Sequence, residues 1–323
     1  MSKSQTMMAL VFDGKVRLRR DYPRPTFGRG EALVAVRMAG VCSTDLEVLK
    51  GYMGFSGVMG HEFVGVVAEG PREWRGKRVV ADINCVCGRC DMCRRGLSNH
   101  CRNRTVLGID GHDGAFAEYL AVPVHNLHEV PASVSDEQAV MVEPLAAACQ
   151  IARQVKIDVA SNVVVLGDGR LAQLVVRALK PLLGHLLMVG RHATKLEAAE
   201  KQGVATVLVG DFVPTAKADV VVDATGSADG FALAMKTVRP RGTIVLKSTV
   251  AAESGMNLAP LVINEISVIG SRCGPFPAAI KALASGKVDV SALVSKVYPL
   301  AQAAEALSEA GNGQSIKVLI HVP

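Results

Sequence analysis

The sequence predicts an α/β protein in which a doubly wound parallel sheet is inserted into a mainly β domain. Two observations along the 323-residue chain predict this fold class. Up to about residue 150, short apolar segments follow one another with loops between them and no regular alternation with long helices. From residue 151 to about residue 287, strands and helices alternate, which is the pattern of βαβ units. Apolar residues make up 49% of the chain, and the length allows two separate cores.

The first region, residues 1–150, is expected to consist of short strands and loops. Its apolar segments end at glycine or polar residues, which is typical of strands in a partly buried sheet. The expected strands are 32–41, 63–68, 79–83 and 115–122, and a helix over 145–155 follows them. The tail, residues 288–323, adds a helix at 301–310 and a strand at 316–321.

The second region, residues 151–287, is expected to form the parallel sheet. Its strands are predicted at 162–166, 185–189, 206–209, 219–223, 242–247 and 267–270, with helices at 171–182 and 193–202. Open sheets of this kind bind ligands beyond the carboxyl ends of their strands. The residues at these strand ends are therefore candidates for a binding site.

Charge and hydropathy narrow the class of partner. The net charge of +6 is scattered, and the densest basic run, 17–20, has no interleaved aromatic residues, so nucleic acid is not expected. No apolar run reaches the ~18 residues needed to span a membrane, and the first residues do not resemble a cleavable signal. We expect a cytoplasmic protein with no membrane partner, whose eight cysteines are metal ligands, catalytic groups or buried residues rather than disulfides.

A cluster of cysteines predicts a metal site in the segment 85–101. Four of them follow the spacing Cys87-x2-Cys90-x2-Cys93-x7-Cys101, which allows four thiolates to converge on one tetrahedral Zn²⁺. All four positions would be filled by protein, so this zinc would be structural rather than catalytic. An iron–sulfur cluster, which also takes four thiolates, is the alternative. Cys85 is expected to have no metal role.

A glycine-rich loop follows the strand expected at 162–166. The loop reads Gly167-Asp168-Gly169-Arg170-Leu171 and opens a helix. This G-x-G pattern between a strand and a helix predicts a dinucleotide site, because glycine permits a tight turn and the helix N-terminus attracts the diphosphate.

The end of the next strand indicates which dinucleotide is bound. Enzymes that prefer NAD place an acid there for the ribose 2′-hydroxyl. This chain has Gly190-Arg191-His192 and no acid until Glu197. The missing acid makes room for a 2′-phosphate, which Arg191 can bind, so the sequence favours NADP(H) over NAD(H).

Three further strand ends carry candidate binding residues. Thr225 lies two residues after the strand expected at 219–223 and is expected to lie beside the cofactor. Lys247 and Arg272 follow the next two strands and are candidates to hold an anionic group of the substrate or cofactor.

Two short motifs in the first region complete a resemblance to a known family. Cys42 opens the segment Cys42-Ser43-Thr44-Asp45, and Gly60-His61-Glu62 follows; Glu143 lies far downstream. With the cysteine cluster and the nucleotide region, these motifs resemble the zinc-dependent medium-chain dehydrogenases over nearly the whole chain. Glutamate at 143 resembles the polyol, glucose and threonine dehydrogenase branch, whereas the alcohol dehydrogenase branch has cysteine at that position.

The resemblance implies a GroES-like catalytic domain over 1–150, completed by 288–323, and a Rossmann domain over 151–287. It also implies a catalytic zinc held by Cys42, His61 and Glu143, with Glu62 either binding directly or exchanging with water. An open position on such a zinc would take the substrate oxygen.

The same resemblance assigns the residues that handle the proton. Thr44 would accept the proton of the substrate hydroxyl, and Glu47 stands where relatives often carry a histidine that relays it outward. Asp45 would orient a zinc ligand.

The expected protein is an NAD(P)-dependent zinc alcohol dehydrogenase with two zinc ions per chain. It would act on a small alcohol or carbonyl compound and, by resemblance, form a homodimer or homotetramer. A zinc-free quinone or enoyl reductase and a non-catalytic zinc-binding relative are the alternatives.

Overall fold

The computed structural model describes residues 5–248 and 257–323, and these divide into two compact units. The first unit comprises the described residues within Met1–Glu143, Ile280–Ala284 and Val294–Pro323, and the second comprises those within Pro144–Ala279 and Ser285–Leu293. Of the expected tail, Val294–Pro323 belongs to the first unit, whereas the residues up to Leu293 belong to the second. The break falls before Pro144 rather than after residue 150.

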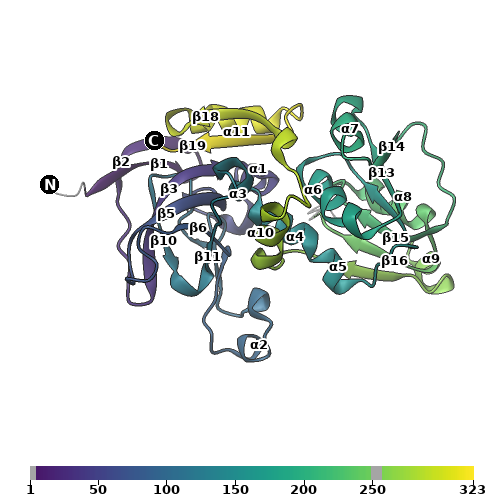
Figure 1. The fold of residues 1–323 in the computed structure, drawn as a ribbon, viewed down its shortest axis with the longest axis horizontal. Coiled ribbons are helices and arrows are strands. Elements are labelled where there is room, and N and C mark those ends of the chain that lie inside the picture. Colours follow the sequence, from purple (N-terminus) through teal and green to yellow (C-terminus); the bar gives the residue numbers. More distant parts are fainter. Residues whose placement is uncertain (1–4, 249–256) are drawn as a thin grey trace. The chain divides into compact units, whose positions relative to one another are not determined.

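The first unit is built mainly from strands (Figure 1). Its largest described sheet has the order β11-β6-β5-β3-β19-β18, and β10 also pairs with β3. The central strand β3 is almost continuously buried, which explains its run of Val and Ala. The strands of this sheet are β3 (Glu31–Gly40), β5 (Glu62–Glu69), β6 (Arg78–Ala81), β10 (Tyr119–Pro123), β11 (Leu127–Glu129), β18 (Val294–Pro299) and β19 (Lys317–His321).

Two small sheets and short helices complete this unit. The order β2-β1-β4 describes one small sheet and β7-β8-β9 the other. The first joins β1 (Thr6–Phe12), β2 (Val16–Pro23) and β4 (Gly57–Val58), and the second β7 (Asn84–Cys85), β8 (Thr105–Leu107) and β9 (Gly111–His112). The helices are α1 (Ser43–Val48), α2 (Asp91–Arg94), α3 (Asp136–Val140) and α11 (Ala303–Gly311).

The second unit contains a parallel sheet flanked by helices (Figure 1). Its order is β14-β13-β12-β15-β16-β17, the order 3-2-1-4-5-6 of a Rossmann fold. Val164, Val221 and Ile244, from three neighbouring strands, pack in one core cluster. The strands are β12 (Asn162–Leu166), β13 (His185–Gly190), β14 (Ala205–Leu208), β15 (Ala218–Asp223), β16 (Val238–Leu246) and β17 (Ser267–Gly270). The helices are α4 (Val142–Cys149), α5 (Ile151–Gln154), α6 (Arg170–Leu179), α7 (Ala193–Glu200), α8 (Ala228–Thr237), α9 (Ala259–Ile263) and α10 (Phe276–Ala284), the first and last of which extend into residues of the first unit.

Most predicted elements are confirmed, with shifted ends. The strand expected at 115–122 is regular only from Tyr119, because Ala117 forms an isolated bridge with Ala9 before it. The helix expected over 145–155 is split into α4 and α5. Within the described ranges, no helix is both long and apolar enough to cross a bilayer.

Candidate active site

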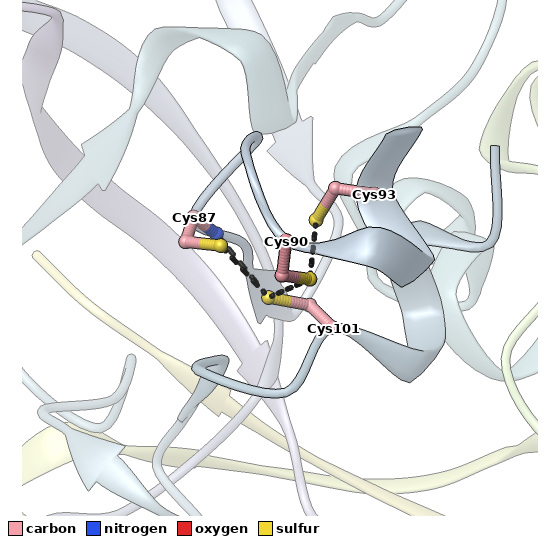
Figure 2. Close-up of side chains that lie close together, drawn as sticks. All are labelled: Cys87, Cys90, Cys93 and Cys101. Atoms are coloured by element: carbon pink, nitrogen blue, oxygen red, sulfur yellow. Dashed lines mark hydrogen bonds between the residues drawn. The ribbon is translucent and has the colours of Figure 1, made fainter. Parts of the chain in front are cut away.

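The four predicted cysteines converge on a common point (Figure 2). The Sγ atoms lie 3.5 Å apart for Cys90 and Cys93, 3.8 Å for Cys90 and Cys101, and 3.5 Å for Cys101 and Cys87. A tetrahedral zinc with Zn–S bonds of about 2.3 Å has S···S edges of about 3.8 Å. The cluster therefore has the size and the donor set of a Zn(Cys)4 site.

The loop is braced around this cluster by an ion pair that the cysteine spacing did not reveal. Arg102 follows Cys101, Asp91 follows Cys90, and the guanidinium of Arg102 donates to both carboxylate oxygens of Asp91 at 2.6 and 2.8 Å. Backbone N–H groups of Arg89 and Cys90 point at the Cys87 sulfur and lower the pKa of Cys87 to about 6. This favours the thiolate form that a metal needs.

A second group of metal-binding side chains lies in the first unit. The ligand atoms of Cys42, His61 and Glu62 all lie within 4.8 Å of one another. Cys42 follows β3, and His61 and Glu62 stand at the start of β5. The antiparallel pairing of these strands sets Gly40 opposite Glu62, which brings the two motifs together. The pairing of β3 with β5 therefore places the Cys42 motif next to His61 and Glu62, the residues that the family resemblance had indicated.

Gly40 and Gly60 make room for this group. A Cβ on Gly40 would lie 2.7 Å from Glu62 Oε2. Gly60 has a φ of 92°, and a Cβ there would lie 2.3 Å from the ring of Phe116. The glycine before His61 is thus required both by the backbone conformation and by the packing of the neighbouring ring.

Asp45 ties Cys42 and His61 to helix α1. It is fully buried, and its Oδ2 accepts the backbone N–H of Cys42 at 2.7 Å. Its Oδ1 faces His61 Nδ1 at 3.4 Å. The predicted orienting role fits this geometry. Thr44, in the first turn of the same helix, has its hydroxyl 3.8 Å from the Cys42 sulfur.

The electrostatics of the group favour a thiolate beside an imidazolium. Burial opposes ionisation of the Cys42 thiol, but the neighbouring His61 outweighs it and lowers the pKa of Cys42 to about 6. Burial likewise opposes the charged form of His61, yet the negative Asp45 and Cys42 raise the pKa of His61 well above its usual value. A site that holds negative charge at a thiol and a carboxylate is suited to a cation.

Glu62 is paired with a lysine from the far end of the chain. Lys317, the first residue of β19, contacts Glu62 Oε2 through its Nζ, which also donates to the carbonyl oxygen of Val41 at 3.2 Å. Both side chains are almost completely buried. The sequence reasoning missed Lys317, since 255 residues separate it from Glu62.

The glycine-rich loop has the predicted form in the second unit. Gly167 has a φ of 112°, and a Cβ there would lie 2.7 Å from the carbonyl oxygen of Ala224. Gly169 is the N-cap residue of α6, and Arg170 and Leu171 form its first turn. Thr225 follows β15 beside this loop, and its N–H and hydroxyl both donate to Asp223 Oδ1, at 3.0 and 2.8 Å. This end of the sheet is where a dinucleotide binds in folds of this order.

Comparison with known proteins establishes the family. The family model of the alcohol dehydrogenase GroES-like domain matches residues 28–132, and that of the zinc-binding dehydrogenase matches residues 171–285. A 2-dehydro-3-deoxy-L-galactonate 5-dehydrogenase of Pseudoalteromonas atlantica is 31% identical over 90% of this chain and 91% of its own. The chain belongs to the zinc-dependent medium-chain alcohol dehydrogenase family. It is an alcohol dehydrogenase-type oxidoreductase that uses zinc and a nicotinamide cofactor on a small-molecule substrate.

Solved structures agree with this membership of the dehydrogenase family. A zinc-binding dehydrogenase from Sinorhizobium meliloti bound to NADP superposes with a TM-score of 0.91, at 27% identity, over 98% of this chain and 100% of its own. The rspB alcohol dehydrogenase from Escherichia coli CFT073, in complex with NADH, gives 0.90 at 26% identity with the same coverage. The predicted combination of a GroES-like domain and a Rossmann domain is confirmed.

Three predicted residues of this dehydrogenase lie apart from the Cys42 group or have other contacts. Glu143, the implied third ligand, is half-buried in the first turn of α4 and is not part of the group. Glu47 pairs with Lys50 Nζ at 2.8 Å on the surface of α1. Lys247 is buried, and its Nζ donates to the carbonyl oxygen of Ala147 at 2.7 Å.

The two candidates for an anionic group are themselves joined. Lys247 Nζ also donates to the Ser271 hydroxyl at 3.3 Å and to the carbonyl oxygen of Arg272 at 3.2 Å. These contacts join α4 to the residues after β17. Arg272 is exposed. A role for either side chain in substrate binding stays a prediction.

Proposed function

We propose that this dehydrogenase oxidises an alcohol of the polyol, sugar or amino-alcohol type, or reduces the matching carbonyl compound. The observation that carries the proposal is the convergence of Cys42, His61 and Glu62 beside the buried carboxylate of Asp45. Zinc bound there supplies a Lewis acid for the substrate oxygen, and the nicotinamide supplies or accepts the hydride. The name of the Pseudoalteromonas relative, which acts on a sugar acid, supports this substrate class.

The donor set fits zinc at both proposed sites. A thiolate, an imidazole and a carboxylate suit Zn²⁺ and leave a coordination position for substrate, whereas four thiolates fill a structural site. We therefore propose two zinc ions per chain. Cys42, His61 and Glu62 would hold the catalytic ion, with Glu143 as a further or exchanging carboxylate ligand.

Thr44 and Glu47 are the proposed path for the substrate proton. The Thr44 hydroxyl can accept the proton of a substrate hydroxyl while it donates its own outward. Glu47 lies one turn of α1 further along and is partly exposed, so its carboxylate can exchange protons with water.

The choice between NADP(H) and NAD(H) has evidence on both sides. The space at Gly190 and the exposed Arg191 favour NADP(H), and so does the NADP-bound neighbour from Sinorhizobium meliloti. The NADH-bound neighbour indicates that the same fold also serves the other cofactor. The carboxylate of Asp168, next to Gly190, bears directly on this choice.

The test is turnover of a substrate panel by two variants of Thr44. Polyols, sugar acids and 3-hydroxy amino acids would be offered with NAD⁺ and with NADP⁺. Thr44→Val keeps the shape but removes the hydroxyl, and we expect kcat to fall about 100-fold to 10,000-fold. Thr44→Ser keeps the hydroxyl and should retain most of the activity. Equal, measurable kcat for wild type and Thr44→Val would contradict the proton path, whereas no turnover of any compound in the panel by wild type would contradict the proposed substrate class. Assembly as a homodimer or homotetramer and a cytoplasmic location remain predictions.

A further inference from the structure

Asp168, the middle residue of the glycine-rich loop, extends toward the end of the neighbouring strand β13. Its Oδ2 accepts the backbone N–H of Arg191 at 2.6 Å and that of His192 at 2.7 Å. The His192 ring also contacts it, with Nδ1 3.0 Å from Oδ2 and 3.2 Å from Oδ1. Asp168 is 7% exposed, so this carboxylate is held in one place by donors from the residues that follow β13.

The same carboxylate lies where a side chain of residue 190 would begin. A Cβ built on Gly190 would lie 2.7 Å from the Asp168 Cβ and 2.8 Å from Asp168 Oδ2. In dinucleotide-binding folds, an acid at the end of the second strand binds the ribose 2′-hydroxyl. Here glycine removes that acid from the strand, and the glycine-rich loop supplies a carboxylate at the same place.

We propose that Asp168 recognises the 2′ position of the adenosine ribose and that the chain therefore selects NAD(H) over NADP(H). This inference rests on the proposed function, because it assumes that the dinucleotide binds at the glycine-rich loop. It also revises the preference that the sequence suggested. The sequence shows that position 190 has no acid, but it does not show that residue 168 fills the space.

The hydrogen-bonding capacity of the carboxylate supports recognition of a hydroxyl. A carboxylate accepts about four hydrogen bonds. Oδ2 accepts two backbone N–H groups and is also the oxygen nearer to the His192 ring, whereas Oδ1 has that ring, at 3.2 Å, as its described partner and retains capacity for a hydroxyl hydrogen.

The same arrangement opposes a 2′-phosphate. A phosphate at this position would need donors such as the N–H groups of Arg191 and His192, which Asp168 already holds. It would also bring negative charge next to a buried carboxylate. Arg191 is exposed, so water weakens the attraction that its guanidinium could offer in compensation.

The alternative is that Asp168 only braces the turn between β13 and α7. In that case Arg191 would be available to a 2′-phosphate, and NADP(H) would be preferred. The two accounts predict opposite effects of removing the charge of Asp168.

The experiment compares the binding of two cofactor fragments that cannot react. Dissociation constants for ADP-ribose and 2′-phospho-ADP-ribose would be measured by titration calorimetry on the full chain, together with those for NADH and NADPH. We expect wild type to bind ADP-ribose at least about tenfold more tightly than its 2′-phosphate, since a hydrogen bond to a charged group and a like-charge repulsion act in the same direction.

Three variants assign the preference to its source. Asp168→Asn keeps the size and one acceptor, and should weaken ADP-ribose about tenfold to hundredfold while strengthening 2′-phospho-ADP-ribose. Glu197→Gln is the matched control, because it removes one negative charge from the exposed face of nearby α7 and should leave the ratio unchanged. Adding Arg191→Ala to Asp168→Asn should abolish the gain for the phosphate form.

The possible results distinguish a failure of the role of Asp168 from a failure of the proposed function. A wild type that prefers 2′-phospho-ADP-ribose, or a folded Asp168→Asn with an unchanged ratio, would overturn the role of Asp168 and leave the dehydrogenase function intact. Absence of binding by all four ligands would instead contradict the proposed function. The wild-type ratio is informative even if Asp168→Asn does not fold.

Discussion

Replacing Lys317 by methionine tests the buried ion pair next to the candidate catalytic site. The change removes the ammonium and keeps most of the apolar stem. It leaves Glu62, whose side chain is 1% exposed, without the cation that contacts it. Removal of one partner from a buried pair typically costs about 3–5 kcal/mol, because the remaining charge stays desolvated. We expect the free energy of unfolding of the first unit to fall by about this amount.

The chain offers a matched control in Lys296. This lysine also pairs with a glutamate, Glu309, at 2.7 Å, but its own side chain is 53% exposed. Lys296→Met should therefore cost much less than Lys317→Met. Urea unfolding of chelator-treated protein, in which no zinc ion can replace the lost ammonium beside Glu62, can be followed by the fluorescence of Trp74, the single tryptophan, which lies in the first unit.

A double variant separates charge from packing. If the unpaired charge of Glu62 causes the loss, Lys317→Met combined with Glu62→Gln should be more stable than Lys317→Met alone. A cost for Lys317→Met no larger than that for Lys296→Met would refute the reasoning.

Three further predictions follow from the geometry of the first unit. Cys101→Ser should reduce bound zinc by one ion per chain and lower the melting temperature, whereas unchanged zinc by elemental analysis would contradict the four-cysteine site. Gly60→Ala should destabilise the fold and cut turnover, because the added methyl meets Phe116 and the φ is positive; wild-type melting and kcat would show that reasoning to be wrong. Burial and the nearby Asp113 raise the pKa of Tyr22 to about 12, so the native state retains this proton more strongly than the unfolded chain, and the resulting stability should be present below pH 10 and lost as the pH rises toward 12. The phenolate absorbance of wild type minus Tyr22→Phe should then have its midpoint near 12, and a midpoint near 10 would refute it.

Local patterns were enough for much of the Rossmann unit. The strand at 162–166 is confirmed to the residue, because a run of Val and Leu bounded by polar residues and glycine specifies a buried strand. The sequence patterns did not predict helix α8. Its segment contains a glycine and a weak apolar stripe, and its start is set by Ser227, whose hydroxyl accepts the N–H of Gly230.

In the candidate sites too, features set by nearby residues could be predicted from the sequence, whereas contacts between distant residues could not. The spacing of the four cysteines is local, so it predicted their convergence. The contact of Glu62 with Lys317, and the position of the Asp168 carboxylate next to Gly190, depend on which strands become neighbours in the sheets. The spacing of residues along the sequence does not reveal which strands are neighbours. Both arrangements change the interpretation of residues that the sequence had already indicated as candidates.

The most direct test of the central claim is zinc content measured together with turnover, for wild type and Cys42→Ser. The account predicts about two zinc ions per chain and nicotinamide-linked turnover for wild type. For a folded Cys42→Ser it predicts about one zinc ion and loss of turnover, since the four-cysteine site is untouched. One zinc ion per wild-type chain, with turnover that Cys42→Ser leaves unchanged, would contradict a catalytic metal held by Cys42, His61 and Glu62.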